Sequence, residues 1–138
     1  MASVTFDSFF SDWAAGNIVP ATDTYYGMLT TGYTPNKGTH AKRSDVTGEV
    51  TGTGYTAGGT AVTCTVAMNT TTHVLTLTFS NPSWSTATIS ATGIVIYKRR
   101  GGAASADNLV AFGDFGGTIS STAGTFTATE TAPLSVQN

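Results

Sequence analysis

Residues 52–57, Gly-Thr-Gly-Tyr-Thr-Ala, fit the spacing of the glycine-rich fingerprint that binds dinucleotides. In that fingerprint the glycines follow a strand and open a helix whose N-terminus receives the pyrophosphate. Here the residues after Gly58 are rich in threonine and alternate with apolar residues, which predicts strands. No Gly-Lys-Ser/Thr follows, so a P-loop is also excluded. We expect no cofactor, and interpret these glycines as places where a strand bends and another backbone comes close.

His40 and His73 are the only histidines, so they are the only candidates for a general base of the imidazole type. His40 precedes Asp45 by five residues in a segment rich in turn formers. The chain has no Gly-x-Ser-x-Gly motif to supply a nucleophile. We therefore predict a hydrogen bond between His40 and Asp45 that orders the loop, and no catalytic residue.

Carboxylates could instead hydrolyse glycosides, but that reaction needs two of them facing each other in a cleft. Most of the acids lie beside predicted turns, where they are solvated or cap a turn; the candidates are Asp23, Asp45, Glu49, Asp107, Asp114 and Glu130. No pair is predicted. Cys64 is the single cysteine and no Cys/His cluster occurs, so we expect neither a disulfide nor a metal site.

Charged residues make up only 10% of the 138 residues, and the formal net charge is -2. Such a chain has no field that would gather nucleic acid or an anionic membrane, and we expect neither as a partner. The N-terminal residues lack a basic leader, and no window holds the roughly 18 apolar residues of a membrane span. We expect a soluble protein made in the cytoplasm.

One helix is predicted, over about residues 5–15, with Thr5 as its cap and Gly16 as its stop. Its aromatic residues recur at spacings of three and four and form one stripe: Phe6, Phe9, Phe10 and Trp13. We expect this stripe to pack against a sheet. The alternative is a docking surface, for which the self-association candidates are Phe9, Phe10 and Trp13.

From Asp23 onward the pattern has period two, which is typical of strands. We predict strands at 24–30, 49–55, 61–68, 73–79, 86–90, 93–98, 108–115 and 124–130. The strands 61–68 and 73–79 form a hairpin whose inward residues are Val62, Cys64, Val66, Met68, Leu75, Leu77 and Phe79. Residues 93–98 are apolar on both faces and predict a central strand. The expected fold is all-β: a two-sheet sandwich of jelly-roll type forming one domain over residues 1–138.

Two long connections, 31–48 and 99–108, are expected to be functional or ordered by a partner. Their candidates for partner contact are Tyr33, Pro35, Asn36, Lys37, His40, Lys42, Arg43, Arg99 and Arg100. The triplet Lys98-Arg99-Arg100 is interpreted as a solvated strand end, and alternatively as a patch that meets an acidic partner.

The order of several stretches resembles a group of small virion proteins of tailed bacteriophages. These stretches are "FDSFFSDWAAGNI", "DTYYGMLTTGYTPNKGTH", "EVTGTGYTAGGTAV", "WSTATISATGIVIYK" and "LVAFGDFGGTISSTAGTFT". The resemblance implies a capsid decoration or cement protein without catalytic or cofactor residues. Its partner would be the major capsid protein, on the exterior of a virion assembled in the bacterial cytoplasm. We expect a homo-oligomer, dimer or trimer. The loop "KRRGGAASADN" departs from the more acidic or neutral pattern of the group.

Two other functions stay open from the sequence. The chain could be an accessory protein of a phage tail, collar or fibre, for which the Thr/Gly-rich β composition is equally suitable. It could also bind or cleave glycans, with Trp84, Tyr33 and Tyr55 as sugar platforms. Trp84 follows a turn, and we expect it to be buried.

Overall fold

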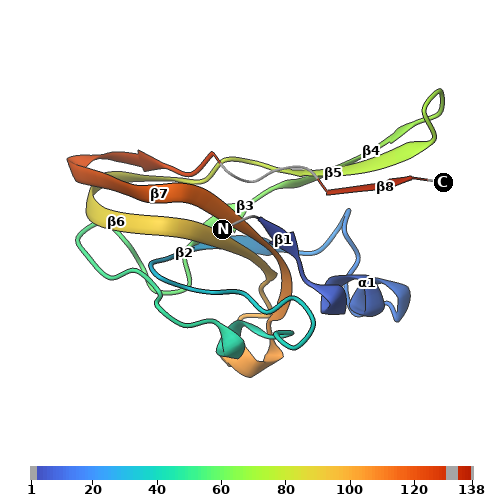
Figure 1. Cartoon of the computed structure of the whole chain (residues 1–138), viewed down its shortest axis with the longest axis horizontal. Helices are drawn as coiled ribbons and strands as arrows, with labels where there is room; N and C mark the ends of the chain where they lie inside the picture. The colour runs from blue at the N-terminus through green and yellow to red at the C-terminus, as the bar shows by residue number, and fades with distance from the viewer. Residues whose placement is uncertain (1–2, 130–133, 138) are drawn as a thin grey trace.

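Two antiparallel sheets and one short α-helix make up the fold (Figure 1). The structure is a computed structural model, and it describes residues 3–129 and 134–137. The larger sheet has the strand order β1-β7-β6-β2-β3, and the smaller sheet has the order β4-β5-β8. The elements are β1 (Val4–Thr5), α1 (Asp7–Ala14), β2 (Tyr25–Thr30), η1 (Arg43–Asp45), β3 (Thr60–Val62), β4 (Cys64–Asn69), β5 (Val74–Phe79), β6 (Ser83–Lys98), η2 (Ala104–Ala106), β7 (Asn108–Thr127) and β8 (Leu134–Gln137).

The large sheet is organised around the long antiparallel pair β6 and β7. The sequence predicted two strands in each of these segments, at 86–90 and 93–98 and at 108–115 and 124–130. Each pair is in fact one continuous strand. β7 ends at Thr127, before the predicted end of the second strand, and Glu130 lies outside the described residues. Four shifts of register, at β-bulges or similar irregularities, take up the breaks in alternation.

The prediction that residues 93–98 form a central strand is confirmed. This part of β6 lies between β7 and β2, and Ile94, Val95, Ile96 and Tyr97 are all buried. Ile94 and Ile96 pack on one face of the sheet, while Val95 and Tyr97 pack on the other. The large sheet therefore needs a cover on both sides.

The smaller sheet covers one face, where Leu77 and Phe79 of β5 join the same buried cluster as Ile94. The Tyr25 and Phe79 rings meet edge to face across the sheets, with centroids 5.4 Å apart. The predicted all-β architecture of two sheets is thus confirmed. The five-plus-three division of strands does not confirm the jelly-roll type of topology.

The other face is covered by the start of the chain and by the loop after β2. Phe6 and Tyr33 lie there in one buried cluster with Val95 and Phe112. The segment 31–48 is a long connection as predicted, but part of it belongs to the core.

The predicted hairpin of β4 and β5 is confirmed, with Cys64 opposite Phe79 and Asn69 opposite Val74. Its predicted inward face is buried only in part, because Val66 and Met68 are exposed. Figure 1 shows the reason, since the far part of this hairpin extends past the large sheet at the upper right.

Residues 49–55 do not form the predicted strand and make only the isolated bridges Thr30 to Glu49 and Thr53 to Thr88. The expected close approach of another backbone is confirmed. At Gly59, which has φ +82°, an added Cβ would lie 1.8 Å from the Gly27 carbonyl oxygen. β3 and β4 follow this glycine-rich segment, so no helix N-terminus is available for a pyrophosphate.

The helix begins at Asp7, and its N-cap is Phe6, which makes no side-chain cap hydrogen bond. The predicted cap, Thr5, belongs to β1 instead. Phe9 is buried and Trp13 packs against the core, which confirms the packing role for this part of the stripe, whereas Phe10 is 46% exposed. No helix in the described part of the chain is long and apolar enough to cross a membrane.

Replacing Gly59 with alanine should destabilise the fold, because the new Cβ would collide with the Gly27 carbonyl at a positive φ. We expect the free energy of unfolding to fall by at least about 2 kcal/mol. Gly102→Ala is the matched control, since nothing lies within 4 Å of its added Cβ. Chemical denaturation of both variants measures the difference, and equal stabilities would contradict this account of the glycine.

Candidate functional site

The loop after β2 is held in one shape by hydrogen bonds among its own side chains. The buried Tyr33 hydroxyl lies 2.7 Å from His40 Nδ1, and the two rings stack. The Asn36 backbone N–H also donates to His40 Nδ1. Burial, with a smaller effect of Asp45, raises the pKa of Tyr33 to about 12. Tyr33 and His40 order the loop, and the buried Tyr33 is not available as a surface contact.

Asp45 fixes the second half of the same loop. One of its carboxylate oxygens accepts hydrogen bonds from the backbone N–H groups of Ala41 and Lys42, both at 2.9 Å. These bonds hold the pKa of Asp45 below its usual value. The predicted hydrogen bond between His40 and Asp45 is not the one formed. Both residues order the loop as expected, but each does so through other partners.

An ion pair between the half-buried Arg43 and the buried Asp107 joins the two long connections. Arg43 Nε donates to the carboxylate of Asp107 at 2.7 Å, and Asp107 is only 1% exposed. The other carboxylate oxygen accepts from the Arg100 backbone N–H. η1 and η2 therefore meet at the bottom of Figure 1, where the two connections form one unit.

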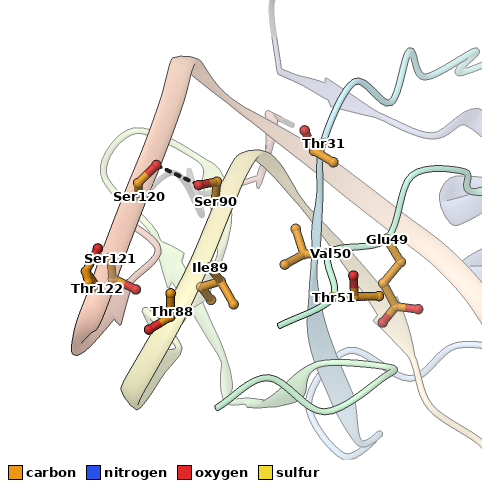
Figure 2. A pocket seen from close by; sticks show the side chains of 10 residues that line it. All are labelled: Thr31, Glu49, Val50, Thr51, Thr88, Ile89, Ser90, Ser120, Ser121 and Thr122. Atoms are coloured by element: carbon orange, nitrogen blue, oxygen red, sulfur yellow. Dashed lines mark hydrogen bonds between the residues drawn. The ribbon is translucent and has the colours of Figure 1, made fainter. Parts of the chain in front are cut away.

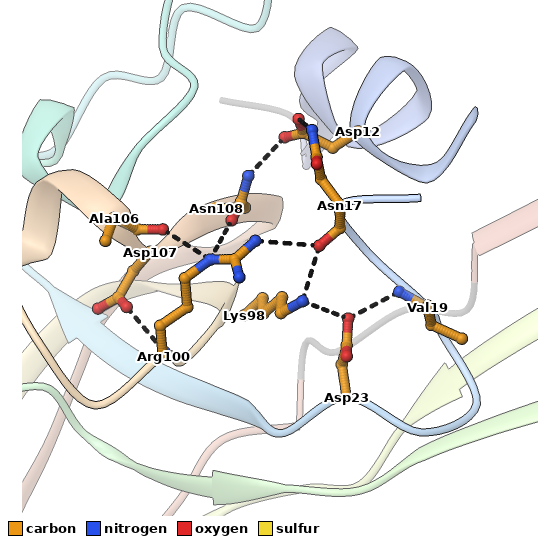
Figure 3. A network of polar contacts seen from close by, with 9 residues as sticks. All are labelled: Asp12, Asn17, Val19, Asp23, Lys98, Arg100, Ala106, Asp107 and Asn108. Carbon is orange, nitrogen blue, oxygen red and sulfur yellow. Dashed lines mark hydrogen bonds and ion pairs between the residues drawn. The ribbon is translucent and has the colours of Figure 1, made fainter. Parts of the chain in front are cut away.

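The basic triplet at the end of β6 is engaged within the molecule (Figure 3). Lys98 pairs with Asp23 at 2.9 Å and donates to the Asn17 carbonyl. The Arg100 guanidinium also donates to that carbonyl, and to Asn108 Oδ1 at 3.1 Å. These cations tie the segment after α1 to the end of the large sheet.

Arg99, the middle residue of the triplet, places its guanidinium over the Tyr26 ring, 4.3 Å from the centroid. The interpretation of the triplet as a merely solvated strand end is therefore incomplete, because all three side chains have partners. Arg99 and Arg100 remain exposed in part, but contacts within the molecule hold both guanidinium groups in place.

Three exposed residues lie on two segments that are joined by a backbone hydrogen bond, the first turns of α1 and the loop after β2: Phe10, Asn36 and Lys37. The Asp7 backbone N–H donates to the Lys37 carbonyl at 2.9 Å, which fixes the loop tip against the first turn of α1. Phe10 lies about one helical turn after Asp7. We call these three residues the loop–helix surface.

The other predicted contact residues of the loop after β2 are less exposed. Pro35, His40, Lys42 and Arg43 are half-buried, and Arg43 is committed to Asp107. The sequence did not indicate which residues of the loop would be buried, because their partners come from distant parts of the chain.

A hydroxyl-lined depression of about 590 Å³ lies between residues 49–51 and the strands β6 and β7 (Figure 2). Its lining is Thr31, Glu49, Val50, Thr51, Thr88, Ile89, Ser90, Ser120, Ser121 and Thr122. The Ser90 and Ser120 hydroxyls, at paired positions of β6 and β7, lie 2.7 Å apart in its wall. Sequence reasoning did not find this depression.

Glu49 is the one carboxylate in this lining, and its carboxylate already accepts two hydrogen bonds from within the molecule. The Tyr55 hydroxyl donates to Glu49 Oε1 at 3.0 Å, and the Gly58 backbone N–H donates to the same oxygen. Burial and the Glu49 charge raise the pKa of Tyr55, so this hydroxyl is a weaker acid than an ordinary tyrosine and is poorly suited to act as a general acid. The lining supplies neither the second carboxylate of a glycosidase nor an aromatic ring for a sugar.

Trp84 is buried, as predicted, and packs near Tyr55 and Phe126. No group of three His, Cys, Asp or Glu side chains within residues 3–129 and 134–137 is arranged to hold a metal ion. Comparisons with known protein families, with curated proteins and with solved structures find no match to this chain.

Asp45 should make stability depend on pH. Because its pKa is lowered in the folded state, its contribution is fully present above the unfolded pKa of about 4 and is lost as the pH falls through the folded value. Asp45→Asn should remove this part of the dependence. Unfolding free energies measured from pH 2.5 to pH 7 should converge for the two proteins at low pH, and a constant gap would contradict the assignment.

Removing the charge of Asp107 should destabilise the unit formed by the two connections. Asp107→Asn leaves Arg43 without its buried counter-ion, and we expect a loss of about 2 kcal/mol. Asp7→Asn is the control, because Asp7 is exposed in the first turn of α1, and about 0.5 kcal/mol is expected there. Equal effects in thermal unfolding would show that the pair does not join the loops.

Proposed function

We propose that this chain is a non-enzymatic capsid cement protein that binds the outer surface of a phage shell. Its partner in this proposal is the major capsid protein, and each bound subunit bridges neighbouring capsomers. The observation that carries the proposal is the loop–helix surface, a long connection fixed from within that still presents Phe10, Asn36 and Lys37 to a partner.

A fixed loop binds with little loss of entropy, because its side-chain bonds are already formed before contact. Phe10 offers an aromatic anchor of the kind that dominates protein interfaces. Lys37 offers a cation for an acidic group on the shell, because it forms no ion pair with another described residue. Together these groups suit recognition of a protein surface.

The mechanism of stabilisation follows from linkage. A subunit that binds the assembled lattice and not its dissociated parts stabilises the lattice by RT ln(1 + [L]/Kd) at each site. Repetition over many sites of the shell gives a large total from a modest affinity at each. The cement role thus requires binding and no chemistry.

A tail, collar or fibre accessory protein is the second candidate, because a fixed binding loop on a β scaffold serves that role as well. A glycan-binding role is less favoured, since the hydroxyl-lined depression has no aromatic platform among its lining residues.

Purified protein added to capsids that lack it tests the proposal directly. We expect co-sedimentation with the capsids and a higher temperature of capsid disruption. Phe10→Ser should weaken binding at least tenfold, whereas Ile119→Ser should not, because Ile119 is equally exposed at 46% but lies outside the loop–helix surface.

Lys37→Glu should also weaken binding, and Lys37→Arg should retain it, if a shell carboxylate is the partner. Failure of the unmodified protein to co-sediment would contradict the proposal. Equal loss for Phe10→Ser and Ile119→Ser would contradict the loop–helix surface as the contact.

A further inference from the structure

The strand β4 has an open edge. In the smaller sheet it pairs with β5 on one side, and no strand pairs with its other side in the part of the chain that the structure describes. Figure 1 shows β4 on the hairpin that extends past the large sheet. An open strand edge is a template for pairing with another chain.

The hydrogen bonds at the start of the hairpin establish which backbone groups point outward. The Ser80 N–H donates to the Thr63 carbonyl, and the Thr63 N–H donates to Ser80 Oγ. Thr63 therefore turns its backbone groups toward the β5 side, and alternation turns those of Cys64, Val66 and Met68 toward the open edge.

The same three residues carry the larger apolar side chains of this strand, whose one other apolar residue is Ala67. Val66 is 38% exposed and Met68 is 49% exposed, whereas Leu77, opposite Val66 on β5, is buried. Open backbone groups and exposed apolar side chains thus coincide on one strand.

β4 itself carries none of the features that usually prevent such pairing. Natural edge strands are usually blunted by a charge, a proline or a bulge. No Asp, Glu, Lys or Arg occurs from Val50 to Tyr97, and no proline occurs between Thr60 and Phe79. The pairing of β4 with β5 also runs without a register shift.

We propose that β4 pairs antiparallel with β4 of a second copy about a two-fold axis that passes between the two Val66 residues. This register places Cys64 opposite Met68 and Val66 opposite Val66, so each outward backbone group meets a partner. Residues of equal parity share a face, which brings apolar side chains together. The resulting sheet is continuous across two subunits.

A second copy fits this edge better than a different protein, because the edge is complementary to itself. An isologous contact needs the same surface to match on both partners, and the register at Val66 does so for hydrogen bonds and for apolar side chains. The absence of charge from Val50 to Tyr97 also removes repulsion between identical arms.

The dimer interface therefore differs from the helix stripe that the sequence suggested. Phe9 is buried and Trp13 packs against the core, so of the predicted self-association residues only Phe10 is well exposed. The inference goes beyond the capsid proposal and does not depend on it, because a subunit can pair through β4 whether or not it binds a shell.

The mass in solution is the first test. We expect light scattering after gel filtration to give twice the 14.1 kDa of the chain. Val66→Lys should raise the dissociation constant at least tenfold, because it places two ammonium groups side by side at the axis. Thr65→Lys is the matched control: it adds the same charge one residue away on the opposite face, and should remain dimeric.

Cross-linking tests the register. In Met68→Cys, the new thiol should lie opposite Cys64 of the other copy and form a disulfide-linked dimer on oxidation. Cys64 and position 68 of one strand lie about 13 Å apart, too far for a bridge within the chain. Ala67→Cys, on the opposite face, should not cross-link with Cys64.

A monomeric wild-type protein at about 100 μM, in the range where weak pairs form, would overturn the proposal. So would a trimer, because this isologous pairing closes at two copies. A dimer that survives Val66→Lys and fails to cross-link in Met68→Cys would overturn it as well, by placing the interface elsewhere. If the monomeric Val66→Lys variant still binds capsids, dimer formation through β4 and the proposed capsid binding are independent of each other.

Discussion

Burial of both faces of one strand is the constraint on which the rest of the structure depends. Residues Ile94 to Tyr97 of β6 are buried on each side, so the large sheet requires two covers. The smaller sheet provides one cover. The loop after β2 and the start of the chain provide the other, which makes a long connection part of the hydrophobic core.

This constraint explains why the loop is held by contacts with the rest of the molecule. Tyr33 must bury its ring against Phe112, and its hydroxyl then needs a partner, which His40 supplies. Arg43 likewise reaches the buried Asp107 and joins the loop to the other long connection. A loop held by these contacts can present a few side chains in a fixed arrangement, and such an arrangement is what a binding surface requires.

Much of the fold could be predicted from alternation. The period of two identified the β4–β5 hairpin, and the doubly apolar segment identified the centre of β6. Bulges were not predictable, because Trp84 to Ala91 reads as interrupted alternation although the strand continues through it. The burial of Tyr33 and the engagement of Arg100 also escaped prediction, since their partners lie far away in sequence. The exposure of Val66 and Met68 depends on how far the hairpin extends past the large sheet, which alternation does not encode.

Charged residues are unevenly distributed along the chain. The two long connections and α1 carry most of the charged groups, while the segment from Val50 to Tyr97 carries none.

Imaging of intact virions by electron cryomicroscopy tests the central claim most directly. The account predicts copies of this chain distributed over the outer surface of the shell, with Phe10 and Lys37 against the capsid protein. Copies confined to the tail or to one vertex, or a shell without this chain, would contradict it.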